Sequence, residues 1–248
     1  MDRPSRQLLD QWRRDEATEF RGWDFSHLRQ RVSYSPLPWD YLALAREQVR
    51  RCGSLLDLAT GDGAVLASFP GLAAATEGHA PNVAIAAERL APLGVRVVAA
   101  RESAPLPFAA AAFDLILNRH GGLHAGAIAQ ALRRGGRFLT QQVGGRSLAD
   151  LIAHFGARPR WPGNVLGAVA AQFAVAGFDV ELAEESSGVA SFADVGAVVY
   201  YLKAVPWLVD GFGVEAHLPR LQALQQRLEA RGRLEFATNS FLLLATRR

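Results

Sequence analysis

The chain has 248 residues, 50% of them hydrophobic, and a formal net charge of +3 at pH 7. This length and apolar content suffice for one large domain with a sizeable core. No run of about 18 apolar residues occurs, so neither a transmembrane helix nor a membrane partner is expected. The polar start, MDRPSRQLLD, lacks the apolar segment of a signal peptide, and the single Cys52 cannot form an internal disulfide. We therefore expect a cytoplasmic protein.

The positive charge alone does not predict a nucleic-acid partner. Lys203 is the only lysine, so 26 of the 27 basic residues are arginine, a bias that matches the many alanines and glycines. The arginines are spread along the chain and interleaved with acids, whereas a nucleic-acid face needs them clustered. A nucleic-acid partner is therefore disfavoured, although it stays open as an alternative.

Residues 1–48 predict an N-terminal helical cap. The segments PSRQLLDQWRRDEATEF and PWDYLALAREQVRRC each indicate a short helix, the second with Pro38 near its first turn, and SYSPLP forms an irregular link between them. This part of the chain also holds Trp12, Trp23 and Trp39. We place the main domain at residues 49–248.

From Gly53 onward, short apolar runs alternate with helical stretches. The expected strands are SLLDLA, AAATE, VRVVAA, FDLILN and GRFLTQQV. The expected helices lie near residues 63–69, 82–90, 125–133 and 165–176. This alternation indicates βαβ units in a mostly parallel sheet with helices on both faces.

The end of the chain departs from this rhythm. FDVELAEES predicts a sixth strand and LEFATNSFLLLATRR a seventh, antiparallel to its neighbour. Between them, VGAVVYYLKAVPW and HLPRLQALQQRLEARG predict helices, so residues 188–230 form an insertion or a lid. The predicted fold is α/β, with a Rossmann-like seven-stranded sheet.

The residues of the glycine-rich turn in LLDLATGDGAVLASF distinguish between three classes of candidate ligand. A phosphate-binding P-loop needs G-x-x-x-x-G-K-[ST], and no lysine follows the turn. A dinucleotide fold needs a third glycine where Leu66 stands, and a bulky residue there hinders close packing of helix and strand. S-adenosylmethionine has no phosphates and remains compatible with the turn. A plain βα turn without any ligand is the alternative interpretation.

The residues resemble class I S-adenosylmethionine-dependent methyltransferases. The run Asp57-Leu58-Ala59-Thr60-Gly61-Asp62-Gly63 matches the first motif of that family, acid-x-G-x-G-x-G, with Ala59 in place of the first glycine. Glu77 ends the second strand, 20 residues after Asp57, and APLPFAAAAFDLILN and ALRRGGRFLT resemble later family segments. The resemblance covers about residues 50–145. GWDFS, PWDY, TEG, NRH and TQQVGG are also similar to a group of bacterial methyltransferases.

The resemblance implies a cofactor site. Asp57 is expected at the amino acid end of the cofactor, Gly61 and Gly63 at its adenosyl part, and Glu77 at the ribose hydroxyls. The implied cofactor-binding residues are Asp57, Ala59, Thr60, Gly61, Gly63, Glu77, Gly78, Glu102, Ser103 and Asn118. Asp62 is interpreted as a helix N-cap rather than a ligand.

The residues that follow the fourth strand are candidates for chemistry. His120 titrates near neutrality in an ordinary environment and is the candidate base, with a structural loop histidine as the alternative. Arg119 is a candidate for binding an acceptor carboxylate or phosphate. His120 and His124 have the spacing of a helical metal pair, but Gly121-Gly122 disfavours a helix there, so no metal is expected.

Several polar and aromatic residues are candidates for contacting the acceptor. Gln141 and Gln142 end the fifth strand, where side chains alternate, so one of them is expected to be simple strand polarity. Trp23, Trp39 and Tyr41 either line a lid over the acceptor or anchor the cap. YYLKAVPW is a further candidate wall of an acceptor pocket, and an amphipathic core helix is its alternative.

The sequence thus predicts an enzyme that transfers a methyl group from S-adenosylmethionine to O or N of a small-molecule acceptor, leaving S-adenosylhomocysteine. Two alternatives stay open: an RNA or protein methyltransferase, and a non-catalytic domain of the same fold that binds a nucleotide or a partner. The motifs do not indicate the acceptor or the oligomeric state.

Overall fold

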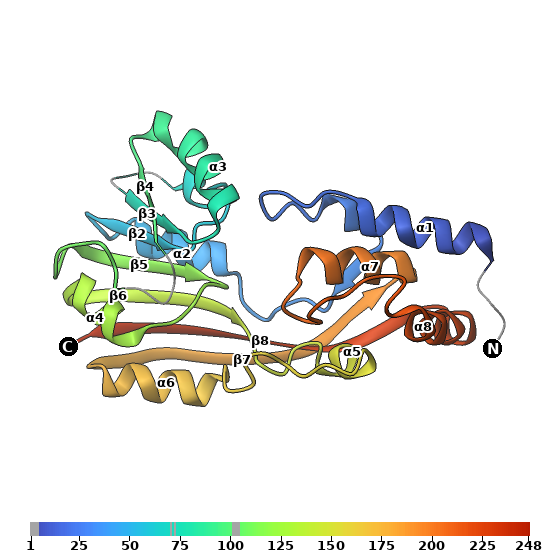
Figure 1. Ribbon diagram of the computed structural model, residues 1–248. Coiled ribbons are helices and arrows are strands. Elements are labelled where there is room, and N and C mark those ends of the chain that lie inside the picture. The colour runs from blue at the N-terminus through green and yellow to red at the C-terminus, as the bar shows by residue number, and fades with distance from the viewer. Residues whose placement is uncertain (1–4, 70, 72, 101–104) are drawn as a thin grey trace.

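The computed structural model describes residues 5–69, 71, 73–100 and 105–248. Within these residues an eight-stranded sheet runs in the order β1-β7-β8-β6-β5-β2-β3-β4 (Figure 1). Its strands are β1 (Val32–Tyr34), β2 (Leu55–Leu58), β3 (Ala73–Glu77), β4 (Arg96–Ala99), β5 (Phe113–Arg119), β6 (Leu132–Val143), β7 (Phe178–Phe192) and β8 (Leu234–Arg247). The helices are α1 (Arg6–Ala17), α2 (Tyr41–Val49), α3 (Ala80–Leu90), α4 (Ala125–Ala131), α5 (Ala149–His154), α6 (Leu166–Val175), α7 (Val195–Ala204) and α8 (Leu218–Arg231).

All seven predicted strands are present, but the prediction of seven strands is wrong by one. Strands β2 to β6 pair in parallel, and β8 lies antiparallel between β6 and β7. The additional strand, β1, pairs antiparallel with β7 at the edge of the sheet, Ser33 opposite Ser191. It arises from the link that was predicted to be irregular, because three residues ahead of Pro36 are too few to show strand periodicity.

The sheet is buried on both faces, as its continuous apolar strands predict. Leu115 and Leu117 of β5 pack into one core with α2 and α3, whereas Ile116 packs into another with α4 and α6. Side chains alternate along a strand, so a single strand supplies both cores. Helices therefore cover both faces, as expected.

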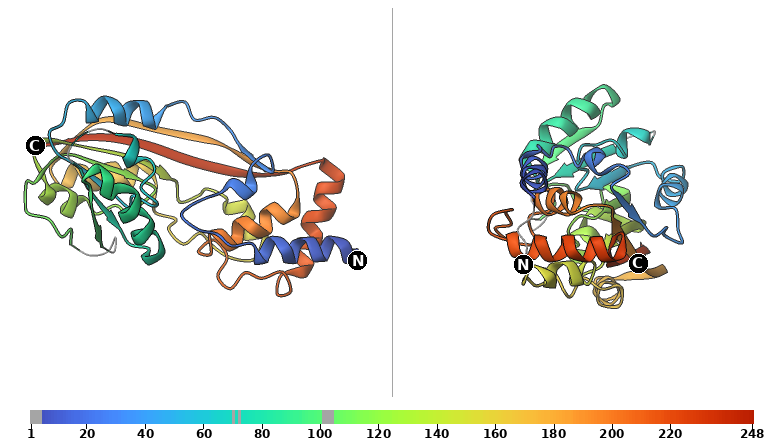
Figure 2. Two further views of the ribbon diagram at one scale, coloured as in Figure 1. Left: turned by 90° about the horizontal axis from the view of Figure 1, so that it is seen from above. Right: turned by 90° about the vertical axis from the view of Figure 1, so that its right-hand side faces the viewer.

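Strands β7 and β8 continue beyond this layered part of the molecule. Their pairing runs from Phe178 opposite Arg247 to Phe192 opposite Leu234. The far half of this ribbon packs with α1, α5, α7 and α8 around a third core that includes Trp12. The layered part and this second part together give the molecule an elongated shape (Figures 1 and 2). We call these parts the sheet lobe and the helical lobe. The helical lobe lies beyond the carboxyl ends of the parallel strands (Figure 1).

The N-terminal segment contributes to both lobes. Helix α1 packs on α7 and buries Trp12 completely, whereas α2 buries Tyr41 and Ala45 in the sheet lobe. The two helices predicted as one cap thus belong to two different cores. The boundary after residue 48 stays a prediction.

The predicted helix at residues 63–69 is wrong. Only a single 3-10 turn, Leu66–Ser68, forms there, and Phe69 is already extended with φ −105° and ψ 133°. Gly63 has φ 76° and Pro70 follows closely in the sequence, so the stretch between them is too short to propagate a helix. Leu66 therefore does not crowd a helix–strand contact, and it is buried in the core instead.

A partly buried charge cluster ties the N-terminal segment to α7. Arg31 donates to both carboxylate oxygens of Asp15, at 2.8 and 3.0 Å, and to both of Asp194, at 2.6 and 2.9 Å. His27 Nε2 also lies 2.8 Å from Asp15. A Cβ on Gly196 would lie 2.0 Å from Asp15, so the contact between α1 and α7 requires glycine.

Among the described residues, no helix combines the length and the apolar character needed to span a bilayer.

Candidate functional site

The carboxyl ends of β2, β3 and β5 bring three loops together at one edge of the sheet. Leu58 lies opposite Asn118 in the register of β2 and β5, and β3 pairs on the other side of β2. A Cβ on Gly121 would come within 2.6 Å of the Ala59 Cβ, so the loops after β2 and β5 touch. In open α/β sheets, ligands bind outside this edge.

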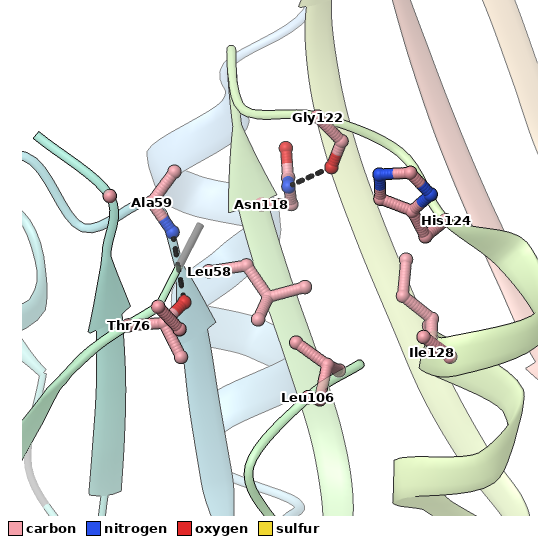
Figure 3. A pocket seen from close by; sticks show the side chains of 11 residues that line it. Leu58, Ala59, Thr76, Leu106, Asn118, Gly122, His124 and Ile128 are labelled. Carbon is pink, nitrogen blue, oxygen red and sulfur yellow. Dashed lines mark hydrogen bonds between the residues drawn. The ribbon is translucent and has the colours of Figure 1, made fainter. Parts of the chain in front are cut away.

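A pocket opens at this edge (Figure 3). It is lined by Leu58, Ala59, Thr76, Gly78, Ala100, Leu106, Asn118, Gly122, His124, Ala127 and Ile128. Three of these, Ala59, Gly78 and Asn118, are predicted cofactor-binding residues. The pocket is narrow, with a volume of about 30 Å³, which is too small to enclose a ligand as large as a nucleoside. Glu102 and Ser103 lie outside the described residues.

Glu77 holds the loop after β2 in place. The Gly61 amide donates to one of its carboxylate oxygens and the His79 amide to the other, each at 2.7 Å. The side chain is buried, with 5% of its surface exposed. A carboxylate has about four lone-pair sites, so each oxygen can still accept a further hydrogen bond. Glu77 therefore shapes the turn and retains acceptor capacity.

Asp57 is a buried carboxyl that is close to its titration point at neutral pH. Burial raises its pKa to about 7, the hydrogen bond from Thr60 Oγ1 at 2.7 Å opposes this rise, and the negative charge of Glu77 adds to it. A cation placed beside Asp57 would favour the charged form and lower the pKa. The Thr60 side chain thus positions Asp57, and the backbone amide of Thr60 donates to the Thr76 carbonyl at 2.9 Å.

The turn itself takes left-handed backbone conformations. Ala59, Gly61 and Gly63 have φ values of 55°, 65° and 76°. A Cβ on Gly63 would lie 2.9 Å from the Leu90 side chain of α3, so glycine is needed there for packing as well. Ala59 adopts the left-handed conformation despite its Cβ, which explains why the family motif has glycine at this position. The interpretation of Asp62 as a helix N-cap is wrong, because no described helix begins there. Its carboxylate instead accepts from the Ala64 amide at 3.0 Å in a local turn and pairs with Arg89.

Asn118 and Gln142 form a buried polar network. Gln142 Nε2 donates to Asn118 Oδ1 at 2.7 Å, to Thr140 Oγ1 at 2.8 Å and to the Gly121 carbonyl at 3.1 Å. Asn118 Nδ2 donates to the Gly122 carbonyl at 3.1 Å (Figure 3). Gln142 is thus a structural support of the loop after β5, while Asn118 both supports the loop and lines the pocket.

His120 belongs to a second network, on the other side of β6. Its Nε2 lies 3.2 Å from Gln141 Nε2, and Gln141 Oε1 accepts from Trp39 Nε1 at 2.9 Å. Since the amide nitrogen is a donor, His120 Nε2 is the acceptor. Trp39 and Gln141 therefore fix the tautomer of His120, with its other ring nitrogen protonated.

The expectation that His120 titrates near neutrality is wrong. Desolvation and the positive charge of Arg119 lower its pKa to about 4. The residue is nevertheless exposed, and it has an unusual φ of 67°. His120 is therefore neutral at pH 7, and its protonated ring nitrogen is a hydrogen-bond donor.

Arg119 and Tyr41 lie beside each other. The Arg119 guanidinium lies 5.8 Å from the centre of the Tyr41 ring, and Tyr41 is buried. Burial and the negative charge of Asp57 raise the pKa of Tyr41, and the positive charge of Arg119 opposes this rise only in part. The Tyr41 hydroxyl therefore stays protonated. The Arg119 guanidinium is held but exposed, and it can still meet an anion.

The N-terminal segment reaches the glycine turn. A Cβ on Gly61 would lie 3.0 Å from Trp23 Cδ1, and one on Gly22 would lie 3.6 Å from Asp62 Cβ. The Trp23 ring also meets Trp207, with centroids 5.8 Å apart, and Trp207 meets Trp161 at 6.4 Å. Sequence reasoning missed Trp161, because no spacing or motif connects its loop with that of Trp23.

Comparison with known proteins identifies the fold. No protein-family model and no curated protein matches the sequence. Among solved structures, a functionally unknown protein of Deinococcus radiodurans is 16% identical with a TM-score of 0.59, covering 88% of this chain and 91% of its own. A SAM-dependent methyltransferase of Geobacter sulfurreducens, in complex with S-adenosyl-L-homocysteine, is 18% identical with a TM-score of 0.50, covering 87% and 94%.

The cyclase SpnF is 17% identical to this chain with a TM-score of 0.51, and the match covers 83% of this chain and 80% of SpnF. The chain therefore has the fold expected from its resemblance, that of class I S-adenosylmethionine-dependent methyltransferases. One fold supports different reactions, so the activity has to be argued from the site.

Proposed function

We propose that this protein is an S-adenosylmethionine-dependent methyltransferase that acts on O or N of a small-molecule acceptor. The observation that carries the proposal is Glu77. It is a buried acid at the carboxyl end of β3, beside the pocket, and each carboxylate oxygen already accepts one backbone amide hydrogen bond. An acid held in this way suits two neighbouring hydroxyls, such as those of a ribose.

The other residues of the edge fit the remaining parts of the cofactor. Asp57 offers a carboxyl that becomes charged beside an ammonium group, and the turn at Gly61 and Gly63 lets the backbone approach an adenosyl group closely. Gly78 and Asn118 line the pocket that would take the base. When bound, S-adenosylmethionine would supply a methyl group on a sulfonium, whose sulfur leaves as the neutral thioether of S-adenosylhomocysteine.

His120 is proposed to orient the acceptor by donating a hydrogen bond from its protonated ring nitrogen. It is neutral at pH 7, and Trp39 and Gln141 set its tautomer. Its Nε2 already accepts from Gln141 and its pKa is about 4, so it is a poor base, and its contribution is to position the acceptor. Arg119 offers a guanidinium for an anionic group of the acceptor.

A small acceptor is favoured over RNA or a protein. The loop containing Gly22 and Trp23 lies against the glycine turn, so part of the edge is covered rather than open to a macromolecule. Arg89 pairs with Asp62, so of Arg89 and Arg119 only Arg119 presents a free charge in the described part of the chain, whereas a phosphate backbone needs a cluster of them.

Calorimetric titration with S-adenosylmethionine and S-adenosylhomocysteine tests the cofactor proposal. We expect dissociation constants in the micromolar range, about −8 kcal/mol, and no comparable binding of NAD. Glu77→Ala should weaken binding at least about fivefold, near 1 kcal/mol, because charge-assisted hydrogen bonds are lost. Glu88→Ala, at an exposed position on α3, is the matched control and should not change the affinity. Unchanged affinity in Glu77→Ala, or preferred binding of NAD, would contradict the proposal.

A further inference from the structure

Three indole rings form one aromatic surface beyond the carboxyl edge of the sheet. The ring centroids of Trp23 and Trp207 are 5.8 Å apart at 64°, and those of Trp207 and Trp161 are 6.4 Å apart at 60°. Trp23 and Trp161 expose 40% and 57% of their surface. The three residues come from loops distant in sequence, so the fold has gathered them. Exposed aromatic surface gathered in this way is a candidate binding site.

The indole surface spans the reacting part of the candidate site. At one end, Trp23 touches the turn after β2 at Gly61. At the other, the Trp161 carbonyl would lie 2.2 Å from a Cβ on Gly145, just after β6, whose last residue Val143 is 47% exposed. Strand β5 lies between β2 and β6 in the sheet, so the loop with His120 is between the two ends.

Charge decides which ligand this surface suits. The Arg160 guanidinium already lies 5.2 Å from the centre of a Trp161 ring, and Arg119 lies over Tyr41. Near Trp23, Asp62 pairs with Arg89, and Asp24 accepts from the amide of Ser26 at 2.8 Å and from its hydroxyl at 3.0 Å. A cationic ligand would meet the positive charges of Arg160 and Arg119, and a neutral or anionic ligand avoids this repulsion. Flat rings, in contrast, stack favourably on indoles.

We infer that the methyl acceptor is a planar aromatic small molecule, neutral or anionic, that packs against Trp23, Trp161 and Trp207. The inference rests on the proposed function for the role of the ligand as acceptor. The aromatic surface itself is independent of the cofactor residues Asp57 and Glu77.

Calorimetric titration of the full chain with four probes tests the inference, with and without S-adenosylhomocysteine. The planar probes are 2-naphthol and 2-naphthoate; decahydro-2-naphthol is the saturated comparator and 2-naphthyltrimethylammonium the cationic one. At least one planar probe should bind about tenfold or more tighter than both comparators, since stacking and charge both favour it.

Variants locate the binding. Trp161→Ala removes an exposed ring and should weaken binding of the planar probes about tenfold, whereas Trp161→Phe, which keeps an aromatic ring, should retain most of the affinity. Val175→Ala changes an apolar residue of α6 that is 90% exposed, and it should leave binding unchanged. A thermal melt of each variant confirms folding.

Four results would overturn the inference: no binding of either planar probe, equal binding of the saturated comparator, tighter binding of the cation, or no effect of Trp161→Ala. The titration with S-adenosylhomocysteine separates this outcome from a failure of the proposed function. If the cofactor product binds and the planar probes do not, only the aromatic acceptor is wrong. If the planar probes bind at Trp161 and the cofactor product does not, the methyltransferase proposal is wrong and the aromatic site stands.

Discussion

Ala59 holds a conformation that suits glycine, with φ 55°. A Cβ in the left-handed region costs about 1 kcal/mol or more, and glycine avoids this cost but is freer in the unfolded chain. Ala59→Gly should therefore raise the free energy of unfolding by about 0.5 kcal/mol, measured by urea denaturation. Ala84→Gly, at an exposed position inside α3, should lower it by about 1 kcal/mol. A less stable Ala59→Gly would show that the strain is absent.

Asp57 makes stability depend on pH. Its pKa is about 7 in the folded chain, above the usual value of 3.8, so the folded state binds more protons than the unfolded state between these values. The contribution of Asp57 to stability is thus full below about pH 4 and is lost as the pH rises towards 7.

We expect Asp57→Asn to raise the free energy of unfolding at pH 8, on the order of 2 kcal/mol, because it removes the buried charge while its amide oxygen can still accept from Thr60. It should also flatten the pH dependence between 4 and 7 in urea denaturation. Asp210→Asn, at an exposed carboxyl, should do neither. A variant that loses stability at pH 8 would show that the carboxylate is stabilised in the folded chain.

Helix α1 depends on α7 through the charge cluster centred on Arg31. Asp15 is 5% exposed, so removal of the guanidinium leaves a buried carboxylate whose remaining side-chain partner, within the described part of the chain, is His27. We predict that Arg31→Met lowers the free energy of unfolding by about 3 kcal/mol, and that Asp15→Asn in the same chain restores part of the loss. Urea denaturation of the single and double variants measures the coupling. Additive losses would mean that the two residues act independently.

The parallel strands and the glycine turn were predictable because they depend on local pattern. Apolar runs such as LILN are buried on both faces, and Ala59 to Gly63 form the turn the motif indicates. The stretch 63–69 was misjudged because one left-handed glycine and a nearby proline outweighed its helical composition. Strand β1 is too short to show periodicity, and helix α5, with only six residues, was not predicted at all.

The candidate site was predictable only in part. Glu77 was found through its distance from Asp57, but its hydrogen bonds to two backbone amides depend on the fold. His120 was expected to titrate near neutrality, because the sequence does not show that its loop is desolvated beside Arg119. The contact between Trp161 and Trp207 depends on how α5, α6 and α7 pack, and no local pattern encodes it.

At the scale of the molecule, the two lobes share β7 and β8. Unfolding of either lobe would leave half of this ribbon without its packing, so the lobes should unfold together. Native-state hydrogen exchange should give similar opening free energies for β2 in the sheet lobe and for α7 in the helical lobe. A substantially lower value for α7 would show that the helical lobe opens on its own.

The position of β8 also constrains how the chain folds during synthesis. β8 lies between β6 and β7 in the sheet, and Leu234 and Phe236 at its start are buried in the core of the helical lobe. It follows every other described helix and strand along the chain. None of the three cores can therefore be completed on the ribosome until β8 has emerged, and the nascent chain exposes the apolar faces of β6 and α7 until then.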